Sequence, residues 1–481
     1  MIRGASYKAM AALAVAAALV AQRAGWHASG ATRAALGYAA SALLLMAVVE
    51  MAAPILGRRR LHPAPSPAIR PRVVVLVLTA LLAPNAAARP LAPYLVLMPR
   101  TPPTIPLAIL IGSWAVAVAV LARRGYSTRW LAVSLAGLMV GTRLLAQWVW
   151  PFHRLDGDML ENVRRAFEAM SFGHSPYLVE APPMPYLPLT LLPYAPAWAL
   201  GVDLRYANAV CDALTAVAAV YLGRLVAIRA GRDADSGPAI EQLLLPCLML
   251  HPIWVHFGAN TQYPPSVLLA TLLGYAALLS GPRLQAIVLG LATGANQMIG
   301  ACGPILLAGW ARRWGPARAV GLGALAAAMF MLVLAPFLAW DAGPLARSAF
   351  LERGGMSGPV MSGRFTFLPL ASRVAPHAAT IATALVLAAA SWTAHASRRP
   401  AATLAAMAVG LCAAMLFQPV SFAHYFLPAV ALAAILPPAD GRAPARPPRP
   451  IAALRADSRA GAPARRAASI FRLSRNANCE K

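Results

Sequence analysis

The sequence has little negative charge and almost no lysine. Only 16 of its 481 residues are aspartate or glutamate, against 42 lysines and arginines, and Lys8 and Lys481 are its only lysines. Charged residues make up 12% of the chain and hydrophobic ones 59%, whereas about a quarter of an ordinary soluble protein is charged. This composition excludes a typical soluble domain and indicates a membrane protein.

Paired cysteines are also missing. The chain has 5 cysteines, four of them inside apolar runs, and no two form a C-x-x-C pair, so neither a disulfide framework nor a zinc site is indicated. The net charge of +26 comes from arginines in short clusters between apolar runs. That is the positive-inside pattern of membrane proteins, so we expect membrane lipids around the chain and no nucleic-acid partner.

Apolar runs along the chain predict about fourteen membrane-spanning helices, because a bilayer core of about 30 Å needs roughly 20 residues per helix. The predicted fold is an all-α, polytopic transmembrane bundle with a juxtamembrane helix region on its outer face. The runs 284–297 and 300–311 are short, which suits a hairpin or a partly re-entrant pair. The predicted spans are 9–22, 34–56, 73–88, 105–122, 130–150, 205–228, 242–257, 264–280, 284–297, 300–311, 317–338, 377–395, 401–417 and 422–437.

Arginines in the short loops predict which loops are cytoplasmic. The apolar stretch 186–200 must then stay on the outer side, because a crossing there would turn the arginines at 224–232 outward. Three prolines interrupt this stretch, so we expect it to lie along the membrane or dip into it. The first run, 9–22, resembles a signal peptide, but the next run starts so soon that we favour an uncleaved first helix. The clusters expected inside are 58–60, 123–124, 224–232, 312–313 and 398–399.

Acidic residues gather in one predicted outer loop. Five of the 16 lie between positions 156 and 180. From Asp158 onward, apolar residues recur at helical spacing with charged residues opposite, which predicts an amphipathic helix on the outer membrane surface, ended by Gly173. A second polar outer loop, with His251, His256, Asn260 and Gln262, is a candidate to meet the first, although each of its residues alone is better explained as a hydrogen-bonded interfacial side chain.

The first loop resembles a known family. Asp158, then Gly173-His174-Ser175-Pro176-Tyr177, then Tyr186-Leu187-Pro188-Leu189 is similar to the first outer loop of GT-C glycosyltransferases. The closest likeness is to mannosyltransferases that use polyprenyl-phosphate-mannose. Three features depart from that family: the four predicted helices of residues 1–129 come before the single helix that usually precedes the loop, the spacing from Asp158 to Gly173 is about a residue longer than the family's, and Asn296-Gln297 stands where a later helix often has lysine.

The resemblance implies transfer of a hexose, mannose in the first place, from a polyprenyl-phosphate donor to a lipid or glycan acceptor. The reaction would invert the sugar carbon on the periplasmic face of a bacterial inner membrane. The general base would be Asp158, with Asp156 second. No cofactor is expected, although Asp156 and Asp158 offer oxygen ligands for a divalent metal. Residues assigned to the donor phosphate and substrate are His153, Arg154, Tyr177, Tyr186, Arg364, His424 and Tyr425.

The same resemblance divides the chain into three parts. Residues 1–129 would form an N-terminal four-helix membrane region, and 130–438 a GT-C-like catalytic module with outer loops 151–204 and 341–376. Residues 439–481, which contain nine arginines, would form a disordered, basic, cytosolic tail.

Simpler interpretations remain open for the same residues. Asp158 with Glu161 three positions later fits a helix start of the capping-box type, and Glu161 and Glu168 fit a solvated helix face. Tyr177 also fits an interfacial anchor. Asp212, two turns into its predicted helix, has either a function or a partner on a neighbouring helix.

Two other functions also remain open: a lipid or solute transporter, and a catalytically inactive GT-C-like protein. A transporter places ionisable groups near the bilayer centre, whereas acidity in this chain gathers outside the spans, which favours the enzyme.

Overall fold

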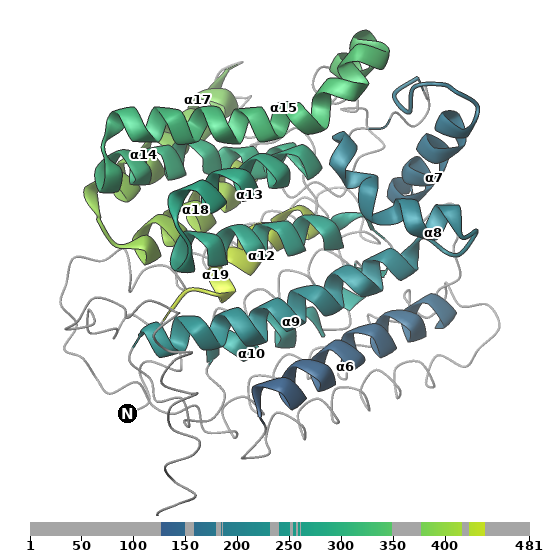
Figure 1. Ribbon diagram of the computed structural model, residues 1–481, viewed down its shortest axis with the longest axis horizontal. Helices are drawn as coiled ribbons and strands as arrows, with labels where there is room; N and C mark the ends of the chain where they lie inside the picture. The colour runs from purple at the N-terminus through teal and green to yellow at the C-terminus, as the bar shows by residue number, and fades with distance from the viewer. Residues whose placement is uncertain are drawn as a thin grey trace, which may run out of the picture.

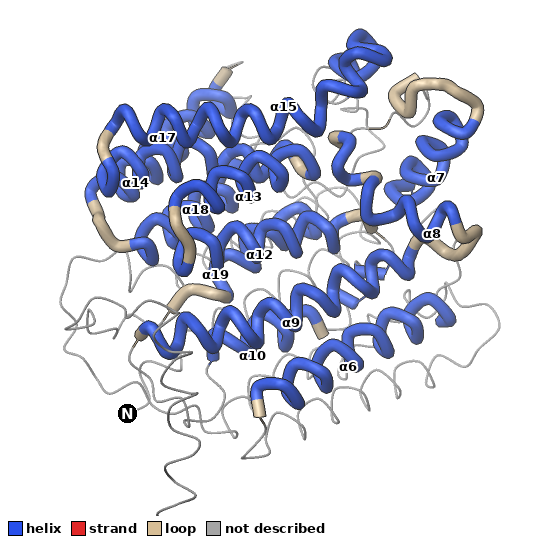
Figure 2. Tube along the Cα trace, viewed as in Figure 1, coloured by secondary structure: helices blue, strands red, loops and turns tan. Residues whose placement is uncertain are grey.

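The protein is described by a computed structural model. The residues it describes are 127–149, 158–178, 184, 186–230, 240–250, 254–255, 258–259, 261–348, 377–415 and 423–437. In this part of the chain every regular element is a helix and none is a strand (Figure 2). The predicted spans before residue 127 and the basic tail lie outside the described residues, so the count of fourteen stays a prediction.

Each predicted span from residue 130 onward overlaps a described helix. Three of these helices, α6 (Thr128–Val149), α9 (Arg205–Arg229) and α15 (Pro316–Ala346), are long and apolar enough to cross a membrane. The remaining α-helices are α7 (Asp158–Ser171), α8 (Ala195–Ala199), α10 (Ile240–Met249), α12 (Tyr263–Leu279), α13 (Pro282–Ala295), α14 (Cys302–Trp314), α17 (Ala378–Ala396), α18 (Pro400–Met415) and α19 (Leu427–Ala434). The 3-10 helices are η2 (Pro188–Thr190), η3 (Leu192–Tyr194), η4 (Gln297–Ala301) and η7 (Ala423–Phe426).

The helices form a bundle with two distinct ends (Figure 1). At the α7 end, on the right of Figure 1, α6 and α10 finish and α9, α12 and α14 begin. Helices α13 and α14, predicted as a hairpin or re-entrant pair, are joined there by η4, but α13 packs mainly on α15 and α14 mainly on α17. These two short helices are therefore held by other helices more than by each other.

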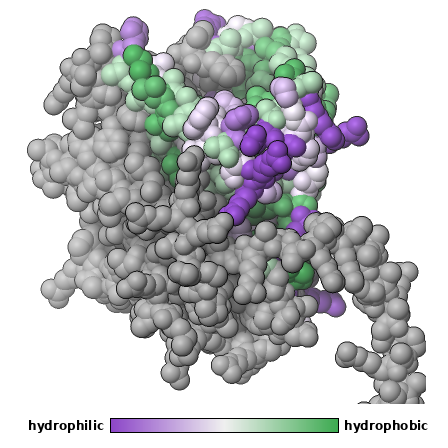
Figure 3. Space-filling view, turned by 90° about the vertical axis from the view of Figure 1, so that its left-hand side faces the viewer, coloured by the Kyte–Doolittle hydropathy of each residue, from purple (hydrophilic) through white to green (hydrophobic). Residues whose placement is uncertain are grey.

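The opposite end, the arginine end, carries the described basic turns. The Arg229 side chain donates to the Leu278 carbonyl at 3.3 Å, so the last turns of α9 and α12 meet there. The turns at 312–315 and 397–399 reach the same end, and Figure 3 looks onto it: hydrophilic side chains gather between apolar ones. The predicted clusters at 224–229, 312–313 and 398–399 thus share one end, as the positive-inside pattern requires. The clusters at 58–60 and 123–124 lie outside the described residues.

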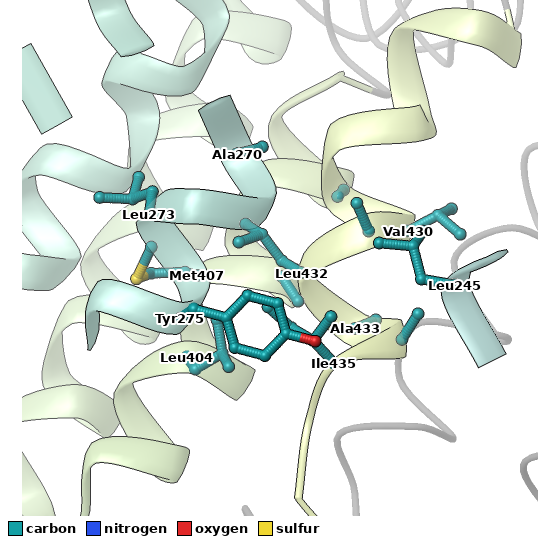
Figure 4. Packing of buried hydrophobic residues seen from close by; sticks show 14 of the residues in the cluster. Leu245, Ala270, Leu273, Tyr275, Leu404, Met407, Val430, Leu432, Ala433 and Ile435 are labelled. Carbon is teal, nitrogen blue, oxygen red and sulfur yellow. The ribbon is translucent and has the colours of Figure 1, made fainter. Parts of the chain in front are cut away.

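The largest apolar core joins α10, α12, α18 and α19 (Figure 4). Leu273 and Tyr275 of α12 pack there with Met407 of α18 and Leu432 of α19, all fully buried. By contrast α15 and α17 expose large apolar side chains, with Val320 and Trp392 each 71% exposed. Such outward apolar faces are stable in contact with lipid, where apolar exposure carries no cost.

Helices α13 and α15 approach each other most closely at Gly290. A Cβ atom there would clash with the Ala326 carbonyl oxygen and lie 2.7 Å from the Met329 Cβ. We therefore expect Gly290→Ala to lower the melting temperature of the purified protein in detergent, because the two backbones must separate. The matched control is Gly321→Ala in α15, which has open space around it. That change should leave the melting temperature unchanged or raise it, because alanine forms helix better than glycine. Equal melting temperatures for the two variants would contradict this packing.

Candidate functional site

The loop that carries the acidic cluster begins as the sequence predicts. Helix α7 starts at Asp158, ends at Ser171, and is followed by Gly173 with φ of 77°. This left-handed conformation is accessible to glycine at little cost and strained for most other residues. The predicted start and stop of the helix are both confirmed.

The environment of α7 differs from the prediction. Leu160, Val163 and Ala166 are fully buried, and the Phe167 ring stacks on Trp198 of α8 with centroids 5.6 Å apart. The apolar face thus packs on the chain itself, in a cluster with residues 177–207 and the end of α15. The expectation that this face lies on the membrane surface was wrong, because the folded-back segment 186–200 covers it.

The charged face of α7 is neutralised internally. Glu161 is only 7% exposed and accepts hydrogen bonds from the Arg164 Nε at 2.8 Å and the Arg165 Nε at 3.1 Å. The bond from Arg164 lowers the pKa of Glu161 against the opposing effect of burial, so this carboxylate stays ionised near neutral pH. The interpretation of Glu161 as a solvated residue was wrong. Glu168, whose side chain is 39% exposed and pairs with Arg164, does belong to the solvated face.

Segment 186–200 does not cross the bundle. It consists of η2, η3 and α8, none longer than five residues, and it packs against α9, α13 and α15 with about half of its residues buried. The Thr190 hydroxyl donates to the Ala295 carbonyl at the end of α13, and the Tyr194 hydroxyl donates to Asn208 Oδ1 of α9 at 2.7 Å. Segment 186–200 thus contains no helix long enough to cross a membrane, as expected, and its place along or within the membrane stays a prediction.

Two predicted substrate residues, Tyr177 and Tyr186, contact each other where segment 186–200 packs near α7. The Tyr177 hydroxyl donates to the Tyr186 carbonyl at 2.9 Å, and its ring stands edge-on to Phe337 of α15. Both tyrosines are 4% exposed, and burial raises the pKa of Tyr177, so its hydroxyl is a neutral donor. Through these contacts, the loop that follows α7 packs against segment 186–200 and α15.

The end of α15 packs against the same cluster of residues around α7. Asp341, with φ of −161° and ψ of 85°, interrupts the helix, and the following turn brings Ser348 to donate to the Met184 carbonyl at 2.8 Å. Leu345 of that turn is fully buried in the cluster with α7. Residues 184 and 348 are thus joined across 164 positions of sequence.

The other predicted site residues fall in two groups. Tyr425 stacks on Tyr263, at the start of α12, with ring centroids 5.2 Å apart and packs against the main core, whereas Tyr177 and Tyr186 belong to the cluster around α7. The second group lies outside the described residues, either entirely or in its side chains: His153, Arg154, Asp156, Asp158, Arg364 and His424. No group of three or more metal-binding side chains occurs among the residues that the structure describes, and the possible metal at Asp156 and Asp158 stays untested.

Four side-chain hydrogen bonds, whose members are here called the polar ring, connect segment 186–200, α9, α13 and the start of α12 at the α7 end. The Asn208 Nδ2 donates to the Thr261 carbonyl at 2.7 Å, and the Asn296 Nδ2 donates to the Ser266 hydroxyl at 3.3 Å. Thr190 and Tyr194 complete it, because they bind the neighbouring α13 and α9. The members are Thr190, Tyr194, Asn208, Thr261, Ser266 and Asn296.

One turn below Asn208, Asp212 is paired with a residue that the sequence did not single out. The Arg143 Nε of α6 donates to Asp212 Oδ2 at 2.6 Å, and both side chains are fully buried. Arg143 also donates to the Met249 carbonyl at 2.9 Å and to the Thr142 hydroxyl at 3.2 Å. Of the two explanations for Asp212, a partner on a neighbouring helix is the one observed. A lone arginine inside the apolar run 130–150 was the signal available.

Two polar side chains in this region lack partners among the described residues. Asp212 Oδ1 accepts no hydrogen bond, and neither the Nε2 nor the Oε1 of Gln262 makes one, although Gln262 is only 2% exposed. Gly258 packs directly on the ion pair, since a Cβ there would lie 2.7 Å from Asp212 Oδ2. Gln262 was expected to be a hydrogen-bonded interfacial residue, and that expectation was wrong.

Comparison with known proteins adds no assignment. No protein-family model matches the chain, and no curated protein or solved structure is similar to it.

Proposed function

We propose that the chain is a membrane glycosyltransferase that moves a hexose, mannose in the first place, from a polyprenyl-phosphate donor to a hydroxyl acceptor. One observation carries the proposal. The acidic helix α7, the Gly-x-Ser-Pro-Tyr exit and the Tyr-x-Pro-Leu step pack into one buried unit at the end of the bundle opposite the arginine turns.

The position of Asp158 suits a general base. It is the first residue of α7, whose remaining described carboxylates are held by arginines. We therefore assign proton transfer to Asp158, with Asp156 two positions before it as the second candidate. The free N–H groups of a helix start favour negative charge, which suits a carboxylate at this position.

The reaction can be written with this residue as base. The acceptor hydroxyl loses its proton to Asp158 and attacks the anomeric carbon of the hexose from the face opposite the lipid phosphate. The new glycosidic C–O bond forms while the bond from that carbon to the phosphate oxygen breaks, with positive charge developing on the sugar ring. Polyprenyl phosphate leaves with the bonding electron pair, and the anomeric configuration is inverted.

A transporter is the second candidate, favoured by the buried pair between Arg143 and Asp212. Arg143 lies six residues before the end of α6 and Asp212 seven after the start of α9, which places both about 10 Å inside the bundle at 1.5 Å per residue. Ionisable groups within membrane spans often line transport pathways. This pair is satisfied mainly by protein groups, which suits a structural role equally.

An experiment with reconstituted protein separates the two functions. Full-length protein in proteoliposomes receives polyprenyl-phosphate-[¹⁴C]mannose together with a membrane-lipid extract as the acceptor source. We expect label to leave the donor in step with release of polyprenyl phosphate and to appear in a glycoside of inverted configuration. Donor that crosses the bilayer with its sugar still attached would support the transporter instead. Donor that neither reacts nor moves would overturn both.

A further inference from the structure

The geometry points to a sugar-binding subsite around residues 258–262, in which the Gln262 amide and the free oxygen of Asp212 bind hydroxyls of the hexose. The inference rests on the proposed function and names the part of the protein that recognises the sugar, rather than the phosphate or the lipid.

The first argument is the cost of the unpaired atoms. More than nine in ten buried polar groups in native proteins have a hydrogen-bond partner. Here two side chains from different elements, each nearly fully buried, leave three polar atoms without one among the described residues: Gln262 Nε2, Gln262 Oε1 and Asp212 Oδ1. An unpaired buried amide or carboxylate destabilises the folded protein. A ligand that forms the missing hydrogen bonds removes this cost, which adds to the free energy of its binding.

The second argument is placement. Gln262 stands at the start of α12, between Thr261 of the polar ring and Tyr263, and one turn before Ser266 of the ring. Gln262 gives that helix no capping hydrogen bond. On α9, Asp212 and Asn208 are four residues apart and share one face. Asn208 holds Thr261 and Asp212 lies against Gly258, so Asp212 lies beside the short segment that ends at Gln262.

The third argument is chemistry. An amide presents both donors and an acceptor, and a carboxylate oxygen accepts from hydroxyls, so together they match the hydroxyl groups of a sugar. The polar ring itself is made of uncharged hydroxyl and amide groups. Arg143, the nearby cation, is already held by Asp212, Met249 and Thr142. Among the described residues of this region, a phosphate would find a carboxylate and no cation besides the paired Arg143, whereas a neutral sugar meets suitable partners.

The test compares two buried glutamines. Gln262→Met removes the amide but keeps the length of the side chain. Its matched control is Gln285→Met at the start of α13, where Gln285 donates to the Ser280 carbonyl and accepts from the Trp310 indole. Binding of polyprenyl-phosphate-mannose and of polyprenyl phosphate alone is measured for each protein in nanodiscs, together with the melting temperature without ligand.

We expect Gln262→Met to weaken binding of the sugar-bearing lipid roughly tenfold, the effect of losing one or two hydrogen bonds. Its affinity for polyprenyl phosphate alone and its melting temperature should be unchanged or higher. Gln285→Met should do the reverse, with a lower melting temperature and the same preference for the sugar-bearing lipid.

The inference is overturned if wild type transfers mannose but Gln262→Met keeps full preference for the sugar-bearing lipid. It is overturned equally if Gln262→Met lowers the melting temperature as much as Gln285→Met does. Failure of the proposed function looks different, because wild type would then neither prefer nor consume the sugar-bearing lipid.

Discussion

Arg143→Met is expected to destabilise the protein by about 3–5 kcal/mol, because removing one partner of a buried ion pair leaves the other charge uncompensated. The loss is larger than for an ordinary pair because Arg143 also holds the last carbonyl of α10 and lies against Gly258. Denaturation in mixed micelles, followed by tryptophan fluorescence, measures it. The matched control is Arg165→Met on α7. Arg165 also pairs with a carboxylate, but its side chain is 36% exposed, so that change should cost no more than about 1 kcal/mol.

The double variant Arg143→Met with Asp212→Leu tests why the pair exists. If the pair serves only to join α6, α9 and α10, an apolar pair should restore most of the lost stability. We expect that recovery of stability together with loss of the preference for the sugar-bearing lipid, because Asp212 Oδ1 is then gone. A double variant that keeps the wild-type preference would remove Asp212 from the sugar subsite. A double variant no more stable than Arg143→Met would show that the region needs polar groups in order to fold.

Asp158→Asn is expected to reduce mannose transfer by about 10²–10⁴-fold, the usual contribution of a general base. This substitution separates the two roles that the sequence leaves open for Asp158. Asparagine caps a helix about as well as aspartate, so α7 should keep its start and the melting temperature should not change. Asp158→Ala removes both the base and the cap, and should lower transfer and stability together.

Asp156→Asn is the matched control for that series, because it removes an equal charge two residues earlier. We expect a much smaller loss of transfer for it. If Asp158→Asn keeps full activity and only Asp158→Ala loses it, then Asp158 is a helix cap and the assignment of the base is wrong. A larger loss for Asp156→Asn would move the base to that residue.

The positions of most described helices were predictable because they follow from runs of apolar residues, and the arginine pattern predicted that 186–200 lies at the end opposite the arginine turns. The surroundings of α7 were not predictable in the same way. A face made of Leu160, Val163 and Phe167 is equally stable against lipid or protein, since both are apolar. Only the folded path of residues 186–200 decides which one covers it.

The ion pair shows a second limit of the sequence. Arg143 and Asp212 are separated by 69 positions, and periodicity within one helix carries no information about such a contact. Their similar depth, six residues from the end of α6 and seven from the start of α9, was the available clue. Gln262 shows the converse: a glutamine at the end of a span is ordinarily satisfied by neighbours, and only the packed structure reveals that its amide has no partner among the described residues.

The hydrogen bond from Ser348 to Met184 has a consequence for how the protein is made. Ribosomes deliver the chain from its N-terminus, so Met184 and Thr190 leave the ribosome long before Ala295 and Ser348 exist. Until those residues arrive, the segment 186–200 has neither α13 nor the end of α15 to cover it. The α7 end is therefore completed late in biosynthesis, and a nascent chain that stops before residue 348 lacks the contacts that hold this segment in place.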